Sequence, residues 1–249
     1  MTDLFVIWQD PDSRALFPVG RLSNDGEGYR FAYTRGAEQS TRFSPFGRMN
    51  DLNTVYRSEE LFPLFANRLL RKSRPEYADY LRWLGLDGGR YEPLQELART
   101  GGARQTDSLL IYARPERTAR GYECRFFGHG IRYLDPEVHG KISSLVEGQR
   151  LYPLLDVQNP VDSNAVGLMT GAPSWFIGYV PRYLAPDVRA LLEAPDRANM
   201  VIQVERNNAD APMQNRLLCR IEADWPEEFV PCSHEYFREV AAAKRTAAA

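Results

Sequence analysis

No long hydrophobic run occurs in this sequence. Within its 249 residues, no apolar stretch approaches the ~20 residues that a helix needs to cross a bilayer. The opening segment, MTDLFVIWQD, places an acidic residue before a short apolar run and lacks the basic segment of a secretory signal. We therefore expect a cytoplasmic protein without a membrane partner.

Cysteine and histidine are scarce, with three of each. An odd number of cysteines without framework spacing fits a reducing compartment. His129 and His139 lie near Cys124 in the sequence, and Cys232 lies near His234, but neither group has the paired short spacings of a zinc site. We expect no metal and no other cofactor, with the cysteines serving as small core residues.

Familiar catalytic motifs are missing as well. The sequence contains no phosphate-binding Walker loop, no nucleotide-binding glycine fingerprint and no nucleophile elbow. Asp156 and Asp162 lie near each other, which leaves a Mg²⁺-dependent nuclease as one alternative. An Asp pair within a turn, however, more often binds backbone groups. We therefore expect a non-enzymatic protein.

Charge of one sign is not in excess. The chain has 31 basic and 33 acidic residues, for a net charge of −2. Residues 118–192 contain seven of each sign. Because proteins that coat nucleic acid do so with surplus Lys and Arg, any nucleic-acid contact in this region should occur at a small, defined site.

The sequence does contain many short elements, typical of an α+β fold. Apolar runs separated by the turn-forming segments QDPDS and SNDGEG predict an antiparallel meander. The expected strands are 4–8, 16–22 and 29–33. Helical spacing then predicts a helix over 58–73, capped by Ser58, followed by helices within 73–89, capped by Ser73, and at 92–100. The last helix should end at Gly101-Gly102.

Strand-like segments dominate after residue 107. The expected strands are 107–115, 122–134, 149–155, 164–169, 175–180, 200–207 and 215–223. One helix, 186–194, is embedded among them. This pattern predicts a small β-barrel or sandwich. We expect three parts: an α+β module at 1–112, the barrel at 118–235 and a C-terminal tail at 236–249.

A polar strip, DVQNPVDSNAVGLMT, interrupts two apolar runs at residues 156–170. Its Asn and Asp side chains are explained by turns in which they bond their own backbone. Nearby, Tyr133 and Tyr183 are explained as core aromatics, and Arg132 and Arg182 as surface charges. Each segment considered alone thus has an ordinary structural explanation.

Together, these segments bring cations, aromatic rings and one acid to the strand ends of one barrel. Guanidinium groups bind phosphate through a fixed fork, and a Tyr ring offers a stacking face to a base. A carboxylate repels phosphate but accepts a hydrogen bond from a sugar hydroxyl. Such a site would prefer a nucleic-acid end that carries an unmodified hydroxyl.

The stretch FGHGIRYL…LVEGQRLYPLLDVQNPVDSNAVGLMT…WFIGYVPRYLAPDVRALL resembles a HIRAN domain of the bacterial or phage type over residues 120–195. The resemblance implies an OB-like β-barrel with short helices. It also implies binding of single-stranded DNA at its 3′ end. It assigns phosphate contact and base stacking to Arg132 and Tyr133, and acceptance of the terminal hydroxyl to Asp162.

The same resemblance extends to three further positions and shows one departure. It implies a phosphate contact for Arg182 and an aromatic contact for Tyr179, and Asn164 belongs to the motif that presents the acid. Val161 stands where a related protein has an aromatic residue, which removes one stacking face. We therefore expect DNA binding by Arg132, Tyr133, Asp162, Asn164, Tyr179 and Arg182.

The N-terminal segments WQD…FPVGRL…GYRFAY, SEELFPLFANRLL and YEPLQELARTGG are similar to the small N-terminal lobe of HipA-type proteins. That likeness implies docking of a protein partner, with Trp8 and Trp83 as candidate contacts, although both also suit a core. No kinase motif follows. A protein-interaction adaptor in a toxin-antitoxin, defence or repair assembly, with a structural barrel, is therefore the alternative function.

Overall fold

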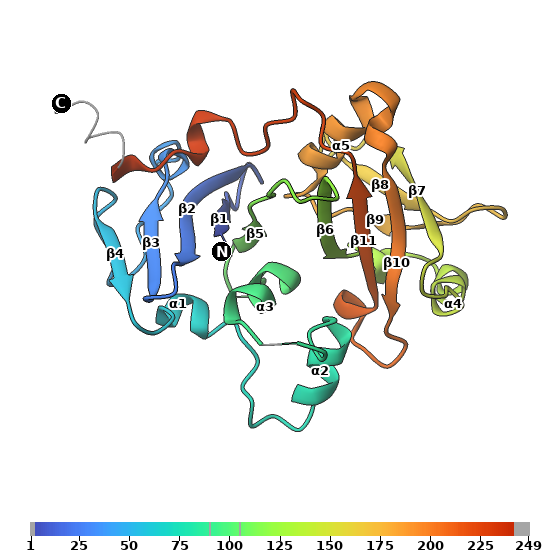
Figure 1. Cartoon of the computed structure of the whole chain (residues 1–249), viewed down its shortest axis with the longest axis horizontal. Coiled ribbons are helices and arrows are strands. Elements are labelled where there is room, and N and C mark those ends of the chain that lie inside the picture. Colours follow the sequence, from blue (N-terminus) through green and yellow to red (C-terminus); the bar gives the residue numbers. More distant parts are fainter. Residues whose placement is uncertain (1–2, 90, 105, 242–249) are drawn as a thin grey trace. The chain divides into compact units, whose positions relative to one another are not determined.

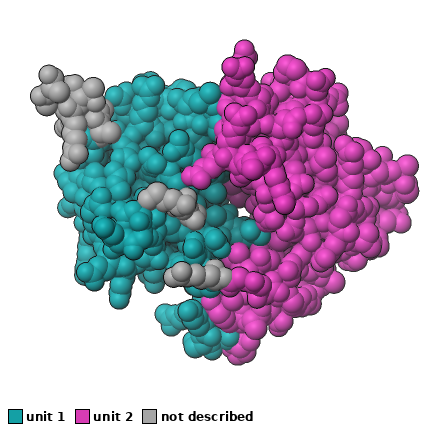
Figure 2. Space-filling model, in the orientation of Figure 1, with its two compact units in different colours: residues 1–74, 90–114, 230–249 teal, residues 75–89, 115–229 magenta. Residues whose placement is uncertain are grey.

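Two antiparallel sheets organise the chain, which a computed structural model describes over residues 3–89, 91–104 and 106–241 (Figure 1). The chain divides into two units, coloured separately in Figure 2. Residues 1–74, 90–114 and 230–249 make up the first unit, and residues 75–89 and 115–229 the second. The first unit is therefore assembled from three separate stretches of sequence.

The first unit is built on a five-stranded sheet of order β4-β3-β2-β1-β5. Its strands are β1 (Asp3–Gln9), β2 (Leu16–Asn24), β3 (Tyr29–Tyr33), β4 (Val55–Ser58) and β5 (Leu109–Ala113). Because alternate residues of a strand share a face, Leu4, Val6 and Leu22 point into a buried core, whereas Asp3 and Phe5 lie on the opposite face. The three strands predicted first from the sequence are confirmed, and β4 was not predicted.

Two helices cover the core face of this sheet. They are α1 (Pro63–Ala66) and α3 (Pro93–Thr100). The first unit also contains two short 3₁₀ helices, η1 (Arg35–Glu38) and η5 (Glu235–Phe237). Phe65 from α1 and Leu94 and Leu97 from α3 join the core. Gly101 ends α3 in the left-handed conformation, with φ 68°, as a C-terminal glycine permits.

The helix predicted over residues 58–73 is much shorter in the structure, because tertiary bonds compete with helical ones. Ser58 does not cap it but ends β4, paired with Tyr29. Beyond α1, the Arg68 guanidinium donates to the Gly102 carbonyl at 2.6 Å, and the Leu70 N–H donates to the buried Glu96 carboxylate at 3.0 Å. The Leu70 N–H is therefore not available for a helical bond, and the Arg68 side chain ties this segment to residue 102.

The second unit contains a six-stranded antiparallel sheet of order β6-β11-β10-β7-β8-β9. Its strands are β6 (Tyr122–Phe127), β7 (Arg150–Leu155), β8 (Val166–Met169), β9 (Phe176–Tyr179), β10 (Val201–Asn207) and β11 (Leu217–Ala223). Its helices and 3₁₀ turns are α2 (Tyr77–Trp83), η2 (Ile131–Tyr133), α4 (Pro136–Ser143), α5 (Ala185–Glu193), η3 (Pro195–Asn199) and η4 (Met213–Asn215). Leu151, Ile202 and Ile221 are cross-strand neighbours, each at most 1% exposed, and form the inner face.

The ends of this sheet approach each other. Just after β6, the His129 N–H donates to the Tyr179 carbonyl at 2.8 Å, and the Tyr179 N–H donates to the His129 carbonyl at 2.9 Å. The sheet thus curls into a half-barrel that is joined at one end (Figure 1). The α+β fold class predicted from the sequence, with a barrel-like second part, is confirmed.

The unit boundaries differ from the expected ones at three places, one of which is that residues 230–235, expected in the barrel, belong to the first unit. Residues 75–89 belong to the second unit, where Leu84 packs against Phe127 and Leu218. Helix α2 follows Glu76, so Ser73 is not its cap. In the expected tail, Val240 is 5% exposed and joins the core of the first unit. The last part of that tail, residues 242–249, lies outside the described residues.

Candidate functional site

The loop between β7 and β8 holds its shape with its own polar groups. Its ends meet where the Asp156 N–H donates to the Ala165 carbonyl at 3.0 Å. The side-chain oxygen of Asn159 accepts from the backbone N–H groups of Val161 at 3.0 Å and Asp162 at 3.1 Å. These are bonds of the Asx-turn type, so the turn expected from the sequence is present.

A second set of bonds ties this loop to the end of β9. The Tyr179 phenol donates to Asp156 Oδ2 at 2.9 Å, and Asn159 Nδ2 donates to the same oxygen at 2.9 Å. The hydrogen bonds from Asn159 and then from Tyr179 hold the pKa of the Asp156 carboxyl below its ordinary value. Burial and the hydrogen bond to Asp156 raise the pKa of the Tyr179 phenol. At neutral pH the hydrogen bond that holds the loop therefore joins an ionised acceptor, the Asp156 carboxylate, to a neutral donor, the Tyr179 phenol.

Asp162 and Arg182 form an ion pair near this loop. Asp162 Oδ2 lies 3.7 Å from Arg182 Nε, and their side chains are 14% and 29% exposed. The other carboxylate oxygen, Oδ1, accepts the backbone N–H of Asn164 at 3.0 Å. A carboxylate offers about four lone-pair sites. Asp162 therefore retains acceptor capacity toward a hydroxyl group.

Arg132 and Tyr133 do not end a strand, as the sequence suggested, but lie in the 3₁₀ turn η2. Gly130 precedes this turn with a positive φ of 77°, which reverses the chain after β6. Arg132 Nη2 donates to the Tyr133 hydroxyl, and its guanidinium carbon lies 4.5 Å from the ring centroid. The Tyr133 side chain is 75% exposed. A cation and an aromatic ring are thus presented together to solvent.

Asn164 is half-buried at the end of the loop. Its backbone bonds Asp162, as described above, but within the described ranges its side-chain amide has no hydrogen-bond partner. The amide carries two donors and one acceptor. It therefore has hydrogen-bonding capacity for a ligand.

The six residues predicted as a site fall into three groups around the end of β9. Asp162 meets Arg182, with Asn164 on the same loop, and Arg132 meets Tyr133. Tyr179 stands between these groups, since its side chain bonds the loop and its backbone bonds the segment before η2. In the part of the chain that the structure describes, no hydrogen bond or ion pair joins Arg132 or Tyr133 to Asp162.

Sequence reasoning missed two features of this region. Asp156 and Asn159 were interpreted as turn residues, whereas they also bind the Tyr179 phenol. Their spacing of three positions within a turn was the available signal.

The second feature is a strip of exposed apolar side chains along β7 and its following loop. Its members are Tyr152 (47% exposed), Leu154 (48%), Val157 (69%) and Val161 (64%).

Two negative findings apply to the described residues. In these ranges no three His, Cys, Asp or Glu side chains gather closely enough to hold a metal ion. No helix among them has the length and hydropathy needed to cross a membrane.

Comparison with known proteins gives one family match. Residues 121–225 match the HIRAN domain family. Among solved structures, the chain matches the HIRAN domain of human HLTF at 17% identity and a TM-score of 0.32, covering 43% of this chain and 78% of that one. No curated protein matches the chain.

Proposed function

We propose that the HIRAN domain formed by residues 121–225 binds single-stranded DNA and recognises its 3′ end. The observation that carries this proposal is the Asp162–Arg182 pair, in which a hydroxyl acceptor lies beside a phosphate-binding cation at 3.7 Å. A 3′-terminal nucleotide offers the same two groups in reverse, a hydroxyl donor and a phosphate acceptor.

The Asp162–Arg182 distance supports exchange with a ligand. At 3.7 Å the contact is longer than the ~2.7–3.2 Å of a well-formed hydrogen bond. The two charges therefore attract each other without forming a short hydrogen bond to one another. On binding, Arg182 turns its fork to a phosphate, and Asp162 accepts the terminal hydroxyl.

The exposed pair Arg132–Tyr133 supplies the remaining contacts. Base stacking on an aromatic side chain contributes ~1–3 kcal/mol per base, and the Tyr133 ring is already exposed for that purpose. Arg132 binds the neighbouring phosphate, which replaces its contact with the Tyr133 hydroxyl. The Asn164 amide adds hydrogen bonds to the sugar or base.

Tyr179 takes a positioning role in this proposal. Its phenol is engaged by Asp156 and Asn159, so it holds the loop that carries Asp162 in place. The resemblance to the family implied an aromatic contact with DNA at Tyr179, and this engagement favours support of the loop instead.

The test compares fluorescent oligonucleotides that carry either a hydroxyl or a phosphate at the 3′ end, by anisotropy. Wild-type protein should prefer the hydroxyl end, and Asp162→Ala should remove that preference. Glu147→Ala, which removes an exposed acid elsewhere in the second unit, is the control and should leave the preference intact. Equal affinity of the wild-type protein for both ends would disprove the role of Asp162.

A protein-interaction adaptor is the second candidate function. The exposed strip of Tyr152, Leu154, Val157 and Val161 favours it, since such side chains are typical of contact surfaces when they gather. In that case the N-terminal module, similar to the lobe of HipA-type proteins, docks a second partner. A pulldown from nuclease-treated lysate that recovers one defined protein, lost on Leu154→Asp, would support the adaptor.

A further inference from the structure

The face of the five-stranded sheet opposite the core carries charge. The strand register pairs Asp3 with Ser23 and Phe5 with Arg21, and it pairs Ser23 with Arg30 on the next strand. These side chains therefore share one face. Residues 230–239 pass beside it, and together they line a cavity of about 1050 Å³ that lies wholly within the first unit.

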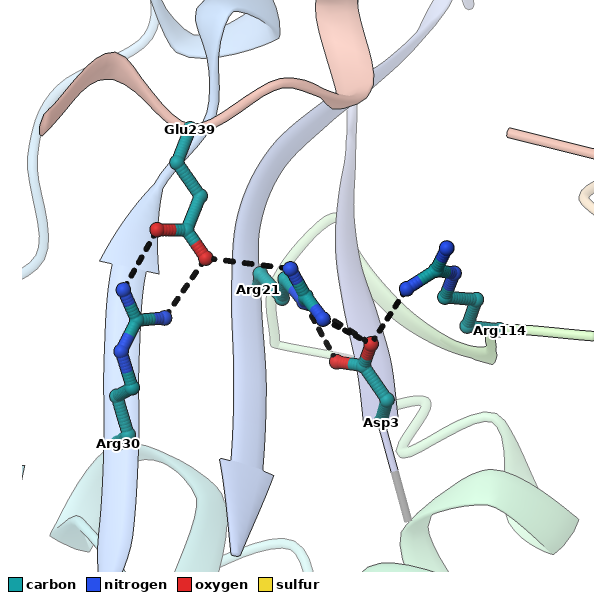
Figure 3. A network of polar contacts seen from close by, with 5 residues as sticks. All are labelled: Asp3, Arg21, Arg30, Arg114 and Glu239. Atoms are coloured by element: carbon teal, nitrogen blue, oxygen red, sulfur yellow. Dashed lines mark hydrogen bonds and ion pairs between the residues drawn. The ribbon is translucent and has the colours of Figure 1, made fainter. Parts of the chain in front are cut away.

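Charges of opposite sign alternate along this face (Figure 3). Glu239 accepts from Arg30 through both oxygens, at 2.7 and 2.6 Å, and lies 3.5 Å from Arg21 Nη1. Asp3 accepts from Arg21 Nε at 2.8 Å and lies 3.4 Å from Arg114 Nη1. The order is thus cation, anion, cation, anion, cation, and both ends of the row are guanidinium groups.

The cavity has more positive than negative charge. Its lining includes five arginines (Arg21, Arg30, Arg35, Arg114 and Arg238) and two carboxylates, those of Asp3 and Glu239. Glu235 offsets Arg35 at 3.4 Å, which still leaves an excess of two positive charges. The exposed Arg238 side chain has no ion pair within the described ranges. Among the described residues, the ion pair of the Arg114 guanidinium is the long contact to Asp3, and the side chain is 47% exposed.

We propose that this cavity binds a phosphate-bearing ligand of nucleotide size. Guanidinium forks match phosphate oxygens through paired, charge-assisted hydrogen bonds. The volume falls near the upper end of the ~300–1,000 Å³ typical of small-molecule sites. Phe5 and Phe237, whose ring centroids are 4.7 Å apart, form an apolar wall for the part of the ligand that is not phosphate.

Glu239 has a defined part in this proposal. It occupies the fork of Arg30 through both oxygens, in the way that a phosphate would. A ligand phosphate therefore competes with Glu239 for Arg30 and Arg21, while Arg114 and Arg238 offer donors that need no displacement. Removing the charge of Glu239 should consequently strengthen ligand binding, which a purely structural ion pair does not predict.

The experiment uses the full chain and calorimetric titration with adenosine diphosphate and inorganic pyrophosphate. Both should bind, and unphosphorylated adenosine should not. Arg114→Ala and Arg238→Ala should each weaken binding about tenfold, as expected for one lost charge-assisted bond. Arg48→Ala is the matched control, since Arg48 is an exposed arginine of the same unit outside the cavity. Glu239→Gln should raise the affinity.

Two results would overturn the proposal. One is absence of binding of both phosphate compounds to wild type and to Glu239→Gln. The other is an equal loss in Arg48→Ala and Arg238→Ala, which would indicate general charge attraction.

An added oligonucleotide separates two sources of phosphate. If it displaces adenosine diphosphate from the Tyr133→Ala, Asp162→Ala double variant, the ligand is a nucleic-acid backbone, and otherwise it is a small nucleotide. Because the cavity shares no residue with the HIRAN domain, this test is independent of the proposed DNA site.

Discussion

The backbone of His129 exchanges two hydrogen bonds with that of Tyr179, with nitrogen–oxygen distances of 2.8 and 2.9 Å. This pair joins the segment after β6 to the last strand of the same sheet. It also fixes the distance between η2, which presents Arg132 and Tyr133, and the loop held by the Tyr179 phenol. The closure of the half-barrel and the geometry of the proposed DNA site therefore share this contact.

Gly178→Ala should weaken this closure. A Cβ at position 178 would lie 2.7 Å from the His129 carbonyl oxygen, and φ is +136°, a conformation that costs a non-glycine residue about 1–3 kcal/mol. Urea unfolding should show a loss of at least that size. Gly140→Ala is the control, because a Cβ there meets nothing within 4 Å and Gly140 lies inside α4. That substitution should be neutral or stabilising by about 0.5–1 kcal/mol.

Tyr179→Phe should change how stability depends on pH. In the folded protein the pKa of Asp156 is lowered by Asn159 and Tyr179. Its contribution to stability is therefore present above the ordinary value of 3.8 and is lost as pH falls through the folded pKa. Without the phenol the folded pKa moves back toward 3.8, so the variant should lose less stability on acidification. Carboxyl NMR titration and unfolding at pH 6 and pH 3 measure this, and an unchanged Asp156 pKa in the variant would refute it. Tyr152→Phe is the control, since this exposed residue lies outside the network.

Arg182→Ala should reduce DNA affinity for all sequences alike. A phosphate contact carries no sequence information, and its loss should lower the slope of log K against log salt by about 0.7 for single strands. Anisotropy titrations at several salt concentrations give that slope. Arg120→Ala removes an exposed arginine at the edge of the second unit and should leave it unchanged. A sequence-dependent effect of Arg182→Ala would argue against a backbone contact.

Tyr133→Ala should weaken DNA binding by about 1–3 kcal/mol through loss of one stacking face, while Tyr133→Phe should retain most of the affinity. Folding stability should be nearly unchanged, because the side chain is 75% exposed. Tyr152→Ala removes another exposed tyrosine of the second unit and should preserve binding. If both alanine variants bind equally well, the stacking role of Tyr133 is wrong.

Local sequence patterns predicted those parts of the fold that local forces determine. Short apolar runs separated by turn residues predicted β1, β2 and β3, and the Gly101 stop of α3 followed from its conformational freedom. The helix over 58–73 was wrong because the Leu70 N–H bonds the distant Glu96 carboxylate and the Arg68 side chain bonds the distant Gly102 carbonyl. The short β4 and α4 were missed, since β4 carries two charged or polar residues in four positions and α4 contains Gly140.

In the candidate site, too, the local features could be predicted from the sequence, whereas contacts between distant segments could not. The Asx turns around Asn159 and Asp162 follow from the residue types in the loop, and the structure contains them. The Asp156–Tyr179 bond does not follow, because it depends on how β8 and β9 bring two segments together. The same applies to the alternating charges on the first sheet. They come from β1, β2, β3 and two segments distant in sequence, and they are Arg30, Glu239, Arg21, Asp3 and Arg114.

The interleaved order of the two units has a consequence for biosynthesis. A chain emerges from the ribosome N-terminus first, and its domains generally fold as units. All residues of the second unit have been made before residue 230, whereas the first unit still lacks Glu239 and Val240 at that stage. All residues of the half-barrel are therefore made earlier, and Arg21 and Arg30 on the first sheet lack the carboxylate of Glu239 until residue 239 has been added.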